Sequence, residues 1–159
     1  MKKILNISLI VLVLTSLSSC FKENKQLFDS MTLVEFQDAV VNANVSGKTF
    51  PLVATTNTVQ TRILRINLVG AQRDKDEVIK FSIDPTESTA IVGTNYDLGG
   101  ATSITIPAKS SFGELKVNIL KAPAQAGKTA IVVFMLEGNG SDIKPNTNYK
   151  KVGYRITLN

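Results

Sequence analysis

The sequence contains no histidine, no tryptophan and a single cysteine, Cys20. Histidine is the commonest general base and metal ligand, so its absence argues against most acid–base catalysis and against a mixed zinc site. A lone cysteine cannot form an intramolecular disulfide, and without histidine no imidazole base is available to activate its thiol. We therefore expect a protein that is not an enzyme and that uses no metal or other cofactor.

A strong charge of one sign is also missing. The 159 residues carry a formal net charge of +5, and only 19% of them are charged. Lysines and arginines are not clustered with aromatic residues, which is the combination that single-stranded nucleic acid requires. The composition predicts no nucleic-acid partner.

A long apolar run is present only at the N-terminus. It follows the basic Met1-Lys2-Lys3 and covers 14 residues, Ile4 to Leu17, with a few Asn, Ser and Thr residues in it. A transmembrane helix needs about 20 apolar residues, whereas the core of a signal peptide needs about 7 to 15. We predict a secretory signal peptide over residues 1–19.

The residues around Cys20 explain why the cysteine is there. Leu17-Ser18-Ser19-Cys20 resembles the lipobox of bacterial lipoproteins. The resemblance implies that the Cys20 thiol receives a diacylglyceryl group, that cleavage precedes Cys20, and that its amine gains a further acyl chain such as palmitate. Two or three acyl chains give stable membrane anchoring, whereas one does not. Cys20 is thus the predicted lipidation site.

Residues 20–31 are then a polar tether between the lipid and the domain at 32–159. No Asp follows Cys20, and Lys22-Glu23 resembles the export signal of Bacteroidetes surface lipoproteins. These features favour the outer membrane and leave open the cell surface and the periplasmic face. Asp29-Ser30-Met31 resembles a short bacterial O-glycosylation signal, which makes Ser30 a candidate glycosylation site.

Apolar residues in the rest of the chain recur at every second position. Each of five segments places one set of side chains on a single face: Leu64/Ile66/Leu68, Ile79/Phe81/Ile83, Ile104/Ile106, Leu115/Val117/Ile119 and Tyr154/Ile156/Leu158. Such alternation is typical of antiparallel sheets with one buried face. Residues 129–136 are apolar on both faces, as in a central strand. We predict an all-β, Ig-like antiparallel sandwich of about seven strands, preceded by the signal-peptide helix.

Two segments of this domain need separate interpretation. Residues 32–41, TLVEFQDAVV, fit a strand with Val34 and Phe36 inward, or a helix with Thr32 and Glu35 at capping-box spacing; we favour the strand. Residues 70–77, GAQRDKDE, have the polar composition of a solvated hairpin loop. Similar turn-rich stretches lie at 98–101, 121–128 and 137–148.

Residues 88–120 resemble the Calx-beta-like sandwiches. The matching positions are Ala90, Gly93, Asn95, Tyr96, Ile104, Ile106, Pro107, Ala108 and Val117. Residues 33–52 are also similar to small Bacteroidetes lipoproteins with Ig-like domains, often encoded near glycan-uptake systems.

Calcium-binding members of the Calx-beta family use acidic residues, but here Asn95 replaces an Asp and KAPAQAGK occupies 121–128. Because Ca²⁺ needs several carboxylate oxygens, we expect no calcium site.

One motif suggests a nucleotide site. Residues 122–129, APAQAGKT, fit a relaxed phosphate-binding loop, which must lead into a helix. The β-branched residues that follow predict a strand instead. We therefore interpret the motif as a connection between strands.

Ligand-binding side chains are few. Tyr149 is the predicted exposed aromatic residue, whereas Tyr96 and Tyr154 are expected in the core. Four scattered carboxylates have no spacing that pairs them for glycoside hydrolysis: Glu87, Asp97, Glu137 and Asp142. We predict a lipid-anchored, non-catalytic accessory module with an envelope protein partner, beside a glycan-uptake system. The alternative is direct carbohydrate binding, and a carboxylate-based hydrolase is less favoured.

Overall fold

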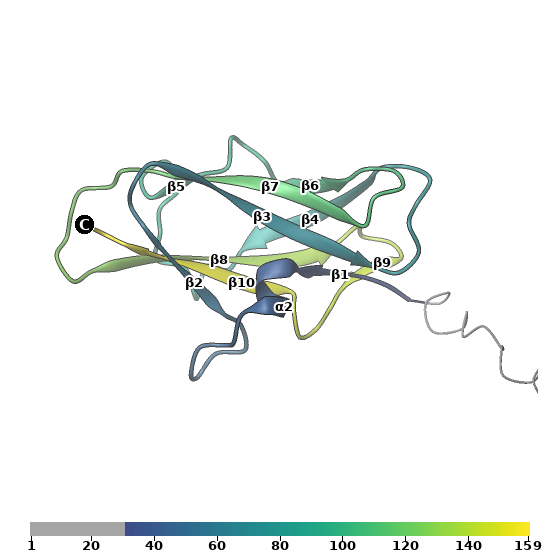
Figure 1. Ribbon diagram of the computed structural model, residues 1–159, viewed down its shortest axis with the longest axis horizontal. Helices are drawn as coiled ribbons and strands as arrows, with labels where there is room; N and C mark the ends of the chain where they lie inside the picture. The colour runs from purple at the N-terminus through teal and green to yellow at the C-terminus, as the bar shows by residue number, and fades with distance from the viewer. Residues whose placement is uncertain (1–30) are drawn as a thin grey trace, which may run out of the picture.

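The computed structural model describes residues 31–159, whose alternating segments form two five-stranded sheets packed face to face (Figure 1). Sheet A contains, in spatial order, β5 (Tyr96–Asp97), β7 (Phe112–Ile119), β3 (Gln60–Val69), β1 (Thr32–Phe36) and β9 (Ile143–Pro145). Sheet B contains β2 (Leu52–Thr56), β10 (Lys151–Thr157), β8 (Thr129–Gly138), β4 (Glu77–Ile83) and β6 (Ser103–Ile106). The predicted signal peptide, Cys20 and Ser30 lie outside the described residues.

The inner faces of both sheets carry the side chains that the alternation placed there. Leu64 and Ile66 of β3 are fully buried, and so are Val117 and Ile119 of β7. In the middle of the core, the Phe134 ring lies against three others, with centroids 6.1 Å from Phe81, 6.4 Å from Tyr96 and 5.9 Å from Tyr154. Such tilted and edge-on pairs stabilise a core beyond the area they bury. The prediction that Tyr96 and Tyr154 are core residues is confirmed.

The prediction of an all-β sandwich is confirmed, and β8 is the central strand of sheet B. The structure has ten strands rather than about seven, because β2, β5 and β9 were not recognised. β5 and β9 have two and three residues, too few to show a period. Two edge pairs, β1 with β9 and β10 with β2, are parallel rather than antiparallel.

Residues 32–41 contain both elements that were considered. The favoured strand is correct for β1, where Val34 and Phe36 are fully buried. The chain then turns into a five-residue helix, α2 (Gln37–Val41), with Asp38 in its first turn, where a carboxylate stabilises the helix dipole. α2 is short, and within residues 31–159 no helix has the length and apolar character needed to cross a membrane.

The interpretation of residues 70–77 as a hairpin loop was wrong, although most of the segment is exposed to solvent as predicted. β3 belongs to sheet A and β4 to sheet B, so the segment crosses between sheets. Asp76 accepts a hydrogen bond from Ala108 N at 2.8 Å, and Glu77 is buried and accepts one from Asn139 Nδ2 at 3.2 Å. Local composition identified a polar turn but could not show which sheet the next strand would join.

Residues 121–128 are a connection between strands, as predicted. β8 begins at Thr129, so the chain runs into a strand where a phosphate-binding loop would need a helix. This geometry excludes a phosphate-binding loop at residues 122–129.

Candidate functional site

The outer face of sheet B is covered by a second, smaller apolar layer. Gly153 of β10 lies between Leu52 of β2 and Val133 of β8 in the sheet register. A Cβ on Gly153 would come within 2.4 Å of the Leu52 side chain, which therefore lies directly over the glycine. Val133 is fully buried and Phe50 is 3% exposed, although neither belongs to the core between the sheets.

Charged groups surround this layer. The ammonium groups of Lys48 and Lys151 lie 5.4 Å and 5.8 Å from the centre of the Phe50 ring. Lys151 Nζ donates to Asp84 Oδ2 at 2.6 Å, and Lys48 Nζ donates to Glu87. Both cations are thus neutralised by carboxylates of the segment that follows β4.

Asp84 is the most strongly perturbed of these groups. It is 7% exposed, and its other oxygen accepts hydrogen bonds from the hydroxyl and the backbone N–H of Thr86. The hydrogen bond from Lys151, together with those from Thr86, holds the pKa of Asp84 well below its usual range. The carboxylate is therefore ionised in the folded protein and ties β10 to the end of β4.

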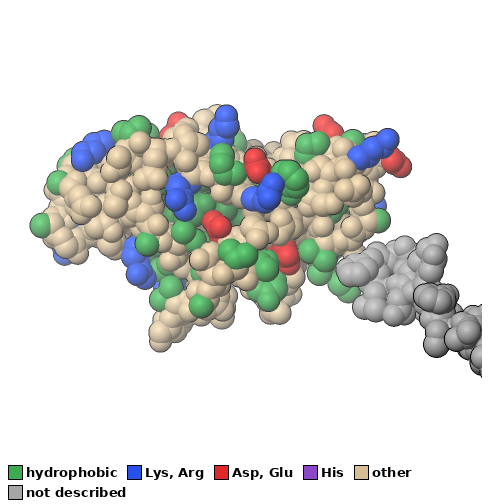
Figure 2. All heavy atoms as spheres, viewed as in Figure 1, with side chains coloured by type: hydrophobic (Ala, Val, Ile, Leu, Met, Phe, Trp, Pro, Cys, Tyr) green, Lys and Arg blue, Asp and Glu red, His purple; other side chains and the backbone are tan. Residues whose placement is uncertain are grey.

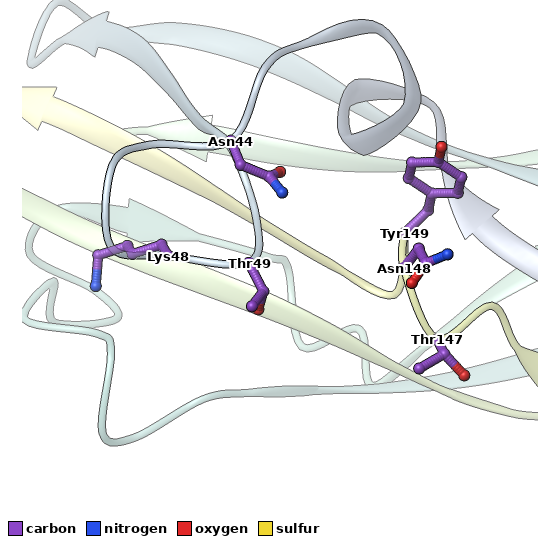
Figure 3. Close-up of a pocket in the computed structure, with 6 residues that line it drawn as sticks. All are labelled: Asn44, Lys48, Thr49, Thr147, Asn148 and Tyr149. Atoms are coloured by element: carbon purple, nitrogen blue, oxygen red, sulfur yellow. The ribbon is translucent and has the colours of Figure 1, made fainter.

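Beside this layer two loops line an open pocket of about 590 Å³ (Figure 3). Its residues come from the α2–β2 loop and the β9–β10 loop: Asn44, Lys48, Thr49, Thr147, Asn148 and Tyr149. The volume lies within the range of about 300–1,000 Å³ that is usual for small-ligand sites. None of the six lining residues is a carboxylate.

The α2–β2 wall of the pocket is a turn. Lys48 N donates to Val45 O at 2.9 Å, and Gly47 adopts φ +77°, a conformation that favours glycine. Val45 N also donates to Phe50 O at 3.3 Å. The buried Phe50 ring thus holds the end of the loop against sheet B.

The β9–β10 wall is tied to strand β1. Asn146 N donates to Val34 O at 2.9 Å, and Phe36 N donates to Tyr149 O at 3.0 Å. The Asn146 side chain donates to Glu35 and accepts from Asn148 N, which closes an Asx turn. Backbone and side-chain bonds therefore place Tyr149 without using its ring or hydroxyl.

The side chains in the pocket fall into two groups. Within residues 31–159, the side chains of Asn44, Thr49, Thr147, Asn148 and Tyr149 make no hydrogen bond to protein groups. Lys48 is the exception, because its ammonium binds Glu87. In Figure 3 the Asn44 amide points toward Tyr149, whereas the Lys48 ammonium points away from it. The pocket thus presents neutral hydrogen-bonding groups and one aromatic ring.

Tyr149 is the predicted binding residue that the structure places in the pocket. It is 37% exposed, so part of its ring is accessible. A second exposed aromatic residue, Phe112, was not predicted; it lies on the outer face of sheet A and is 40% exposed. Phe112 lies at an outward-facing position of β7, which the alternation of apolar and polar residues in this strand already implied.

The four scattered carboxylates are not assembled into one site. Glu87 accepts from Lys48, Asp97 from Gly99 N at 3.0 Å, and Asp142 from Arg73 at 2.5 Å. Hydrogen bonding from Asn139 and the nearby Arg73 lower the pKa of Asp142. Glu137 is exposed. In the part of the chain that the structure describes, no three His, Cys, Asp or Glu residues are close enough to hold a metal ion.

Asn95 has a structural role. Its side-chain oxygen accepts a hydrogen bond from Ile91 N at 2.8 Å, and the residue is 7% exposed. Gly93 in the same turn has φ +77° and donates to Tyr96 O. The Gly-x-Asn-Tyr sequence that carried the family resemblance therefore builds a tight turn before β5.

Sequence patterns did not identify the other pocket residues. Asn and Thr in turns are common for conformational reasons, so their presence at 44–49 and 147–148 carries no functional information by itself. The two loops meet because they lead into neighbouring parallel strands, with Leu52 of β2 beside Gly153 of β10, residues about 100 positions apart in the chain. The pairing of β9 with β1 also fixes the start of the β9–β10 loop.

The fold can now be compared with known structures. The CBD1 domain of Calx, in its apo form, superimposes with a TM-score of 0.59 and 9% identity over 80% of this chain and 96% of that one. A candidate carbohydrate-binding protein of Bacteroides ovatus gives 0.53 and 11% identity over 79% of this chain and 36% of that one. A two-domain protein of unknown function from Bacteroides fragilis gives 0.52 and 8% identity, over 82% and 46%. No protein-family model and no curated protein sequence matches the chain. The sandwich is Calx-beta-like, and at these identities the likeness concerns the fold alone.

Proposed function

We propose that the protein is a non-catalytic binding module of the cell envelope and that its loop pocket binds carbohydrate. The observation that carries this proposal is the set of five neutral polar side chains around the pocket, one of them aromatic, which have no protein partner within residues 31–159. Sugar hydroxyl groups donate and accept hydrogen bonds and so complement amides and hydroxyls. A tyrosine adds an apolar ring face beside a polar group.

Two further points support binding rather than turnover. Glycoside hydrolysis requires a pair of carboxyl groups on either side of the scissile bond. The pocket residues include no carboxylate, and Glu87 nearby is paired with Lys48. The shared fold with a candidate carbohydrate-binding protein is consistent with the proposal but transfers no site residue.

The location is part of the proposal. We infer that Cys20 carries the lipid and holds the sandwich at the outer membrane through the tether at 20–31. On the face of the molecule that Figure 2 shows, basic and acidic side chains are interspersed, as on an ordinary solvated surface. Replacing Cys20 with Ser and fractionating the cells tests the anchor: the variant should leave the outer-membrane fraction, and retention there would refute it.

Binding is tested by titrating the protein with short neutral oligosaccharides (gluco-, manno- and xylo-oligosaccharides) in a calorimeter. We expect at least one of them to bind, and Tyr149→Ala to weaken that binding by about tenfold, or about 1.4 kcal/mol. Phe112→Ala is the matched control, because it removes a similarly exposed ring from the outer face of sheet A, away from the pocket. Absence of binding to the whole panel, or equal losses in both variants, would contradict the proposal.

A second candidate function is docking of an envelope protein. It is favoured by the outer face of sheet A, where Ile63 is 46% exposed and Phe112 is 40% exposed. Affinity capture of envelope proteins with Phe112→Ala and Tyr149→Ala separates the two: loss of a specific partner only in Phe112→Ala would assign protein docking to sheet A.

A further inference from the structure

The sandwich has four edge strands, and three of them are protected against pairing with another strand. β5 has two residues. β9 has three residues, of which Lys144 is charged and Pro145 lacks an N–H. β6 has four residues and lies close to β7, since a Cβ on Gly113 would be 2.5 Å from Thr105 O. Short length, charge, proline and covering are the usual ways of blocking an edge.

β2 has none of these protections. Its five residues, Leu52-Val53-Ala54-Thr55-Thr56, include no charged residue and no proline, and its pairing with β10 shows no bulge. Among the described strands, β10 is the only one that pairs with β2. Within residues 31–159, one side of β2 is therefore an unpaired edge.

The direction of the free backbone groups follows from the ladder. Gly153 N donates to Pro51 O at 3.0 Å, and Asn57 N donates to Thr157 O at 3.0 Å. Because backbone groups alternate in direction along a strand, residues 53 and 55 also face β10, and Leu52, Ala54 and Thr56 face outward. Thr56 O already accepts a hydrogen bond from Gln60 Nε2 at 3.3 Å, and its second lone pair remains for a further donor. Ala54 and Thr56 are exposed.

We propose that this edge pairs with β2 of a second copy of the chain, antiparallel about a two-fold axis at Ala54. Leu52 and Thr56 lie two residues to either side of Ala54. With the axis at Ala54, this residue therefore lies opposite Ala54 of the second copy, and Leu52 lies opposite Thr56 of the second copy. No like charge on the strand opposes the pairing, which is the condition under which an edge is self-complementary. Val59, 71% exposed in the turn after β2, adds an apolar side chain beyond the end of the strand.

The pairing joins the two copies of sheet B into one ten-stranded sheet. A two-fold axis perpendicular to a sheet leaves both outer faces on the same side. The outer layers of sheet B, beside which the two loop pockets lie, are then on the same side of the joined sheet. Two linked sites bind a repeating ligand far more tightly than one site.

The test is disulfide formation in the full chain with Cys20→Ser, so that one introduced cysteine is the only thiol. Directly opposed residues of a hydrogen-bonded antiparallel pair have Cα atoms about 5.5 Å apart, a separation that a disulfide spans. We expect Ala54→Cys to give mostly covalent dimer under mild oxidation. Thr105→Cys, exposed on the protected edge β6, is the matched control and should remain monomeric.

The register is tested with two more variants. Leu52→Cys and Thr56→Cys should cross-link when mixed, and neither should cross-link alone. Ala54→Lys, which places two charges at the two-fold axis, should be folded by circular dichroism and monomeric by light scattering, whereas the unsubstituted chain is a dimer. Monomeric unsubstituted chain, or cross-linking of Ala54→Cys no faster than that of Thr105→Cys, overturns the proposal.

Discussion

The outer faces of the two sheets differ, although their inner faces are equally buried. On sheet A, Arg65 and Glu114 form an ion pair at 3.3 Å whose side chains are 41% and 45% exposed, and the Arg65 guanidinium lies 3.8 Å from the centre of the half-exposed Phe112 ring. On sheet B, Phe50 is buried and Asp84 is 10% exposed in its side chain. The outer face of sheet A is exposed to solvent. The outer face of sheet B carries a small apolar layer that includes Phe50 of the α2–β2 loop and is bordered by the segment that follows β4.

The difference comes from the chain connections rather than from the strands. Both faces carry a similar mixture of apolar and charged residues, with one Phe and at least one ion pair each. Among the described residues, segment 42–51 folds onto the outer face of sheet B, where Gly153 leaves room for Leu52, and segment 84–90 runs beside β8 and is hydrogen-bonded to its backbone. The polar pocket lies where this covering ends, so binding groups are positioned by a packed layer beneath them.

The largest expected loss of stability follows from removing the buried ring that covers the outer face of sheet B. Phe50→Ala removes a buried ring, and substitutions of this kind cost about 3 kcal/mol or more. Phe112→Ala removes a half-exposed ring from sheet A and should cost less than about 1 kcal/mol. Urea unfolding of both variants measures the two values, and equal losses would mean that Phe50 contributes no more than a surface residue.

The second prediction concerns Asp84 and pH. Because its pKa is lowered in the fold, its stabilising contribution is complete above the unfolded-state pKa of about 3.9 and is lost as pH falls toward the lower folded-state pKa. Asp84→Asn should lower stability by about 1–2 kcal/mol at neutral pH. This difference should shrink in acid, as followed by thermal unfolding between about pH 7 and pH 2.

Asp74→Asn is the matched control for this prediction. Asp74 is an exposed carboxylate in the segment between β3 and β4. Its substitution removes a solvated carboxylate and should change the stability by less than about 0.5 kcal/mol. A difference between Asp84→Asn and the unsubstituted protein that stays constant from neutral to acid pH would show that the carboxylate acts through shape alone.

The sequence predicted the inner faces well because alternation reports burial directly. Leu64, Ile66 and Leu68, for example, could share a face only in a strand. It failed for connections: the composition of residues 70–77 is the same whether the chain turns back within a sheet or crosses to the other one. Phe50 was not recognised as buried, since a single aromatic residue in a polar loop has no period.

The candidate site was predictable only in part. Tyr149 could be found by elimination, because Tyr154 lies on an alternating strand and Tyr96 occupies a core position in the family that the sequence resembles. Asn44 and Thr49 could not, since they become binding groups only where the β9–β10 loop is brought beside them by the parallel pairing of β2 with β10. Pairing between distant segments leaves no local mark on the sequence.

A smaller effect is expected from the ion pair at the edge of the covering. Lys48→Met keeps the apolar stem and removes the bond to Glu87, in which both side chains are about one-third exposed. Pairs with this exposure contribute about 0.2–1 kcal/mol, and salt screens them. Lys75→Met, in an exposed loop, is the control in urea unfolding at low salt, and a loss in Lys48→Met no larger than in the control would show that the pair does not hold the loop.

The smallest expected effect is that of salt on ligand binding, and it rests on the proposed function. The single cation that lines the pocket, Lys48, is neutralised by Glu87, and the other lining groups are uncharged. Affinity for the neutral oligosaccharide that binds best should therefore change less than about twofold between low salt and about 0.5 M salt, since screening acts only on charges. Polygalacturonate, an acidic polymer, should bind no more tightly than that neutral probe. Tighter binding of the acidic polymer that salt weakens would show that Lys48 leaves Glu87 and binds the ligand. The ion pair would then change on binding, and the outer layer of sheet B would not be a rigid support for the pocket.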